Sequence, residues 1–105
     1  SDVYKRQVLD FRKRGGKVSM LTNKQHFVLR WVVLYMDKNR RAPSLTEIAT
    51  VYKREYHLKG NGEVVRGTIG ALIHKRCLVR IPGKARGLRV TERGVLELSK
   101  EAADE

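Results

Sequence analysis

The chain has 105 residues, including 23 Lys or Arg, 11 Asp or Glu and a single cysteine, and its formal net charge is +12. This length allows one small domain, and the lone Cys77 excludes an internal disulfide and suits a reducing compartment. The longest apolar run is interrupted by Arg30 and is too short to span a bilayer. So strong a positive charge predicts a polyanionic partner, nucleic acid before an acidic lipid surface. Basic proteins that bind acidic proteins keep a second interpretation open.

Residues 1–19 differ from the rest of the chain, because six basic and two acidic side chains precede the organised pattern that begins at Met20. SDVYKRQ resembles translated linker sequence, and RGGKVSM can be encoded by a ribosome-binding sequence just upstream of a start codon. We therefore expect 1–19 to be a basic, non-native extension and 20–105 to form the domain. The alternative is a basic arm that contacts DNA.

The first two predicted helices begin at capping boxes, in which Ser or Thr is followed three residues later by Glu or Gln. Thr22 pairs with Gln25, and Ser44 pairs with Glu47. Apolar residues recur at helical spacing after each box, so each helix is expected to bury one face. The predicted ranges are 22–37 and 44–56.

A third helix, a hairpin and a last helix follow. Val65, Ile69 and Leu72 recur at helical spacing, and LVRI and LRV are two short strands around a basic loop with two glycines. The predicted ranges are a turn over 57–62, a helix over 62–76, strands over 78–81 and 88–90, and a helix over 92–102. The pattern predicts an α+β, mainly α fold, a winged helix-turn-helix with three helices, a two-stranded β-hairpin wing and a short C-terminal helix.

Three segments carry a resemblance to a known family: LTNKQHFVLRWVV in the first helix, APSLTEIA in the second, and GKARGLRV in the hairpin. Together they resemble the DNA-binding domain of the LexA repressors over residues 21–90. The resemblance implies a winged helix whose third helix enters the major groove of DNA, while the wing touches the neighbouring backbone.

The chain departs from that family in three ways. The stretch YKREYHLKGNG between the second and third helices is longer. Arg76 or Cys77 stands where the family usually has a glycine at the helix end, which predicts a different C-cap. No segment within the 105 residues resembles the self-cleaving serine–lysine peptidase domain of these repressors. The resemblance therefore implies DNA binding and not autoproteolysis.

Matching Ile69 and Leu72 to the family's recognition helix implies a set of base-contacting positions. These are Asn61, Glu63, Val64, Arg66 and Gly67. Arg66 can donate two bonds to guanine, Asn61 can pair with adenine, and Glu63 can accept from cytosine. A solvated charge at Arg66 and a helix-dipole role for Glu63 are the alternatives. Gly67 and Gly70 each cost about 1 kcal/mol against alanine in a helix, and they either let DNA approach closely or reflect drift or a kink.

Other cations and hydroxyls are expected on the phosphate backbone. Lys84 and Arg86 are the predicted wing contacts, because a hairpin tip has little other use for two cations. Ser44 and Thr46 offer hydroxyl and backbone donors at a helix start, although capping alone explains Ser44. The remaining predicted phosphate contacts are Lys24, Arg41, Lys53 and Arg54.

Metal binding and catalysis find little support. His74 and Cys77 lie three residues apart with His57 nearby, but structural zinc usually requires four ligands in paired spacings. The chain has no nucleophile–base set, and its glycine-containing loop lacks the Lys-Ser/Thr ending of a P-loop. We expect no metal, no cofactor, no small-molecule substrate and no enzymatic activity.

The sequence therefore predicts a cytoplasmic, nucleoid-associated protein of a bacterium or phage, which binds duplex DNA and regulates transcription as a repressor would. One small domain contacts little DNA, so a homodimer is expected for tight binding. Leu96 and Leu98 are interface candidates, with packing on the domain itself as their other role. Two alternative functions stay open: a winged-helix replication or partition factor, and an adaptor that presents the basic hairpin to an acidic protein.

Overall fold

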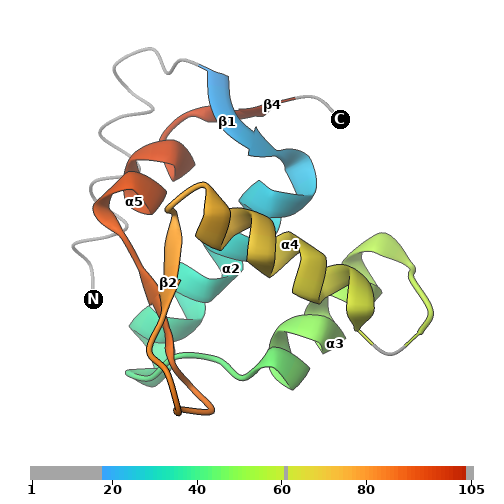
Figure 1. Ribbon diagram of the computed structural model, residues 1–105. Coiled ribbons are helices and arrows are strands. Elements are labelled where there is room, and N and C mark those ends of the chain that lie inside the picture. The colour runs from blue at the N-terminus through green and yellow to red at the C-terminus, as the bar shows by residue number, and fades with distance from the viewer. Residues whose placement is uncertain (1–17, 61, 104–105) are drawn as a thin grey trace.

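This computed structural model describes residues 18–60 and 62–103, which form four helices and four short strands (Figure 1). In chain order the elements are β1 (Val18–Thr22), α2 (Asn23–Asn39), α3 (Leu45–Tyr56), α4 (Glu63–His74), β2 (Leu78–Arg80), β3 (Leu88–Val90), α5 (Glu92–Leu98) and β4 (Glu101–Ala103). The expected α+β, mainly helical class is confirmed, as is the antiparallel hairpin after the third predicted helix. The strands β1 and β4 were not expected.

Both predicted capping boxes are present. Thr22 Oγ1 accepts from the Gln25 N–H at 3.2 Å, and Gln25 Oε1 accepts from the Thr22 N–H at 3.2 Å. Ser44 Oγ accepts from the Glu47 N–H at 3.2 Å, and Glu47 Oε1 accepts from the Ser44 N–H at 2.8 Å. Each box satisfies two backbone donors that a helix start otherwise leaves exposed, so both helices begin where the sequence predicts.

The core lies between α2, α3 and α4, with the base of the hairpin and α5 closing it. Val65, Ile69 and Leu72 face inward from α4, as their spacing predicts. The other buried apolar residues include Val28, Leu29 and Val32 of α2, Ile48 and Tyr52 of α3, Leu78 and Leu88 of the hairpin, and Leu98 of α5. The long helix α2 therefore supplies the surface on which the other helices pack.

The end of α4 corrects one expectation. The Cys77 N–H donates to the Leu72 carbonyl and the Arg76 N–H to the Ile73 carbonyl, both at 2.9 Å, which is the bonding pattern of a Schellman motif. Arg76 has φ +64°, the left-handed conformation that glycine adopts most easily. The prediction that a non-glycine residue would give a different C-cap was therefore wrong, because Arg76 itself takes the left-handed conformation that this type of cap requires.

The hairpin is short and its register is regular. Leu78 pairs with Val90, Val79 with Arg89 and Arg80 with Leu88. In the loop, a Cβ added at Gly87 would lie 2.6 Å from the carbonyl oxygen of Ile81, so the close approach of two backbone segments requires glycine there. Figure 1 shows this hairpin projecting from one end of the molecule, with β1 and β4 at the other.

The C-terminal segment differs from its prediction. The expected helix to residue 102 was wrong, because α5 ends at Leu98 and β4 (Glu101–Ala103) then pairs in parallel with β1. Glu97, which is 5% exposed, accepts from the Ser19 hydroxyl at 2.7 Å and from the Met20 N–H at 2.8 Å. Contacts with a strand at the other end of the chain therefore override the local helical pattern.

The division of the chain at Met20 stays a prediction, since residues 1–17 lie outside the described residues. Val18 and Ser19 belong to β1, and the Ser19 side chain is buried against α5. None of the helices in the described part of the chain is long and apolar enough to cross a membrane.

Candidate nucleic-acid interface

One face of α4 is exposed and lies opposite its buried residues. Glu63, Val64, Arg66 and Gly67 are exposed, and Val64 leaves 54% of its surface uncovered. The helix is also fixed to α3 by a polar contact, because the Thr68 hydroxyl lies 3.3 Å from the Tyr52 hydroxyl. Four of the five predicted base-contacting residues thus share one accessible surface, while Asn61 lies outside the described residues.

The two glycines of α4 are not required by packing. A Cβ added at Gly67 or Gly70 would meet no atom within 4 Å. A helical glycine nevertheless costs about 1 kcal/mol against alanine. The α4 backbone is therefore bare at these two positions although packing within the domain does not require glycine at either.

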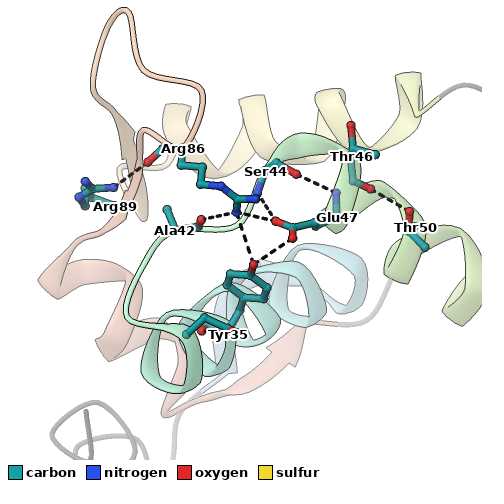
Figure 2. A network of polar contacts seen from close by, with 9 residues as sticks. Tyr35, Ala42, Ser44, Thr46, Glu47, Thr50, Arg86 and Arg89 are labelled. Carbon is teal, nitrogen blue, oxygen red and sulfur yellow. Dashed lines mark hydrogen bonds and ion pairs between the residues drawn. The ribbon is translucent and has the colours of Figure 1, made fainter.

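The hairpin loop leaves Lys84 exposed, whereas Arg86 is partly buried and paired within the protein. Lys84 lies at the tip of the hairpin with an exposed side chain. Arg86 turns back toward the helices, where its Nη1 lies 2.7 Å from Glu47 Oε1, 2.9 Å from the Ala42 carbonyl oxygen and 3.4 Å from the Tyr35 hydroxyl (Figure 2). The two cations that the sequence placed together on the wing thus differ in their surroundings.

The carboxylate of Glu47 joins this cluster to the start of α3. Its Oε1 accepts from Arg86 and from the Ser44 N–H, and its Oε2 accepts from the Tyr35 hydroxyl at 2.9 Å. The Arg86 guanidinium, followed by the Ser44 N–H, lowers the pKa of Glu47 to about 2. The carboxylate in turn raises the pKa of Arg86, so both groups stay charged near neutral pH.

The predicted phosphate contacts fall into two groups. Arg41, Ser44 and Thr46 lie at the start of α3, next to the Arg86 cluster, where the Ser44 hydroxyl is already used in capping. The other three lie toward the opposite end of α3: Arg54 is exposed, Lys53 Nζ donates to the Gly60 carbonyl at 2.9 Å, and Lys24 Nζ lies 5.5 Å from the centre of the Tyr56 ring. Their role in binding stays a prediction.

Sequence reasoning missed the role of Tyr35 and the second role of Glu47. Glu47 was recognised as a capping residue, and a capping box uses a single carboxylate oxygen for the N-cap donor. In the structure the oxygen that the cap leaves free, Oε2, accepts from Tyr35, whereas Arg86 shares Oε1 with the capping bond. Arg89, also missed, donates to the Leu88 carbonyl at 2.7 Å and to the Arg86 carbonyl at 3.1 Å, and so braces the hairpin backbone.

Three features of the described residues lie apart from this surface: the metal-ligating residue types, Cys77 and a pocket. No three His, Cys, Asp or Glu side chains gather to hold a metal ion within residues 18–60 and 62–103. Cys77 is buried, and burial raises the pKa of its thiol. A pocket of about 620 Å³ lies near the start of α2, the end of α3 and β4, and none of the predicted DNA-contacting residues lines it.

Comparison with known proteins adds no relative, because no family model and no curated protein matches this sequence.

Proposed function

We propose that this chain is a winged helix-turn-helix protein that binds duplex DNA at specific sequences and regulates transcription, most simply as a repressor of the LexA type without its peptidase domain. In this proposal α4 is the recognition helix in the major groove, and the β2–β3 hairpin is the wing on the neighbouring backbone. The protein acts in the cytoplasm on nucleoid DNA, as a homodimer where it binds tightly, and performs no catalysis.

One observation carries the proposal. The accessible face of α4 presents Arg66 and Val64 beside a bare backbone at Gly67, on a helix fixed from behind by buried Val65 and Ile69. Arginine is the side chain that most often reads guanine, and an apolar side chain can contact the methyl group of thymine. A net charge of +12 supplies the sequence-independent attraction to phosphates.

Selection from a randomised duplex pool at about 150 mM salt tests the proposal. We expect an enriched motif, with half-sites arranged as a palindrome if the protein binds as a dimer. Arg66→Ala is expected to lower affinity by about 1–3 kcal/mol and to relax specificity at one base position. Arg30→Ala is the matched control, since it removes the same charge from an exposed position on α2.

Three other outcomes contradict the proposal in different ways. Retention of DNA without an enriched motif indicates an architectural or replication function. A motif that survives Arg66→Ala moves recognition away from α4. Failure to retain duplex DNA favours the adaptor that presents its basic hairpin to an acidic protein.

The glycine at position 67 provides a second test. Gly67→Ala is expected to raise the free energy of unfolding by about 1 kcal/mol, because the added methyl group meets no atom of the domain and alanine favours the helix. The same methyl group is expected to weaken DNA binding, because it keeps the helix backbone away from the groove. Urea denaturation and binding titrations measure the two effects, and a more stable variant with unchanged affinity excludes close approach at this position.

A further inference from the structure

The position of the hairpin loop depends on Arg86. The β2–β3 ladder runs only from the Leu78–Val90 pair to the Arg80–Leu88 pair, and a two-stranded hairpin is marginally stable by itself in water. Beyond that ladder, the Arg86 side chain reaches from the loop to the helices (Figure 2). The Ile81 N–H also donates to the Gly87 carbonyl at 2.8 Å, and Arg89 braces the hairpin backbone. Only Arg86 among these contacts ties the loop to the helices, so whatever holds Arg86 helps to position the loop.

Three separate segments hold this guanidinium. Tyr35 belongs to α2, the Ala42 carbonyl belongs to the link between α2 and α3, and Glu47 belongs to the first turn of α3. Glu47 keeps its bond to the Ser44 N–H at the same time. The cluster thus joins the hairpin loop to the N-terminal end of α3.

The Arg86 guanidinium already forms an ion pair within the protein. The Glu47 carboxylate lies 2.7 Å away, and about a third of each side chain is exposed. A phosphate that drew Arg86 away would leave the Glu47 carboxylate without its partner next to a polyanion, which is unfavourable. Lys84, by contrast, is exposed at the tip of the same loop.

We propose that Arg86 is a positioning residue of the DNA interface, whose ion pair with Glu47 holds the wing loop against the start of α3 so that Lys84 meets the backbone while α4 occupies the major groove. This inference rests on the proposed function. Because the loop is already ordered before DNA arrives, the ordering cost is removed from the binding step. The pair therefore contributes to affinity without touching DNA.

The DNA affinity of Glu47→Gln distinguishes a positioning role of the ion pair from a purely electrostatic effect. Removing a negative charge strengthens binding to a polyanion if charge alone matters. Positioning predicts the opposite sign, a loss of affinity of about 2- to 30-fold, the range for residues that couple two sites without contacting the ligand. Glutamine still accepts from the Ser44 N–H, so the start of α3 is kept. The control is Glu55→Gln, the same change at an exposed position of α3, which is expected to bind at least as tightly as the wild type.

The salt dependence of binding locates the charge that touches phosphate. The double variant Glu47→Gln/Arg86→Gln keeps the net charge of the wild type, and we expect it to bind as weakly as Glu47→Gln with an unchanged slope of log affinity against log salt. Lys84→Ala is expected to make that slope shallower by about 0.9, the value for one lost phosphate contact. Tyr35→Phe, which removes one hydroxyl from the cluster, is the milder variant, with a smaller loss of affinity in the same direction.

The outcomes distinguish this inference from the function on which it rests. If wild type binds its selected duplex but Glu47→Gln binds equally or more tightly, the positioning role is overturned and the proposed function stands. The same holds if the charge-neutral double variant loses about 0.9 from the salt slope, because Arg86 then contacts phosphate itself. If wild type binds no duplex DNA, the proposed function fails and the inference fails with it.

Discussion

Two glutamates tie distant parts of this chain together, and their surroundings differ. Glu97 joins the two ends of the domain, accepting from Ser19 and from the Met20 N–H, with Lys100 Nζ at 2.8 Å. Glu47 joins the hairpin to the helices through Arg86. The Glu97 side chain is 7% exposed, whereas that of Glu47 is 35% exposed.

The difference in exposure leads us to expect different roles for the two glutamates. A buried carboxylate must have its partners, since an unpaired one costs several kcal/mol. A half-exposed ion pair is screened by water and contributes little to stability. Glu97 is therefore expected to hold the fold together, and Glu47 to set where the hairpin lies.

The largest expected effect is on stability at the Glu97 end. Glu97→Ala is expected to lower the free energy of unfolding by about 3 kcal/mol, because the buried Ser19 hydroxyl and the Met20 N–H lose their acceptor and Lys100 loses its ion pair. Urea denaturation measures the loss. Glu101→Ala, at an exposed position of β4, is the control and is expected to change stability by about 0.5 kcal/mol or less. Equal losses in the two variants contradict the assigned role of Glu97.

Two variants that each remove one hydroxyl donor compare the Glu97 and Glu47 contacts further, with smaller expected losses of stability. Ser19→Ala removes a donor to Glu97 and an acceptor for the buried Leu21 N–H at 3.0 Å, and is expected to cost about 2 kcal/mol. Tyr35→Phe removes the equivalent donor to Glu47, and a smaller loss is expected because water can replace it. Thermal unfolding of both variants measures the difference. A neutral Ser19→Ala would support the division of the chain at Met20 and argue against a structural role for β1.

Contacts between residues close in sequence were predictable, and those between distant residues were not. Both capping boxes join residues three apart, and the hairpin joins neighbouring strands, so residue type and spacing determined them. The bond from Ser19 to Glu97 spans 78 residues, and β1 pairs with β4 across a still longer separation, with Val18 opposite Glu101. No periodicity in a single sequence encodes such a partner, and the helical pattern near α5 pointed the other way.

In the candidate site, too, local properties of a residue were predictable from the sequence, whereas its contacts with distant residues were not. The helical spacing of Val65, Ile69 and Leu72 predicted which side of α4 is buried. Arg66 and Gly67 lie on its exposed side. Arg86 and Glu47 were each recognised, one as a wing cation and the other as a helix cap. Their contact, across 39 residues, needed the fold. A charged residue that sequence assigns to a ligand can thus be engaged within the protein.

The smallest expected effect is the response of the two glutamates to acid. Partners lower both folded-state pKa values: Arg86 and the Ser44 N–H do so at Glu47, and at Glu97 burial raises the pKa but the bonds from Lys100, the Met20 N–H and Ser19 outweigh it. For Glu47 the folded-state pKa is about 2, against an ordinary value of 4.5. A lowered folded-state pKa gives stability that is complete above the ordinary value and is lost as the pH falls toward the folded-state value.

Thermal unfolding between about pH 7 and about pH 2 measures this response. The melting temperature of the wild type is expected to fall below about pH 4.5, as both carboxylates become protonated in the unfolded chain. Glu47→Gln and Glu97→Gln each lack one titrating group whose folded-state pKa is lowered, so each curve is expected to be flatter than that of the wild type in that range. A Glu47→Gln curve as steep as that of the wild type contradicts the stabilising effect of Arg86 on the carboxylate, and an equally steep Glu97→Gln curve contradicts that of Lys100, the Met20 N–H and Ser19.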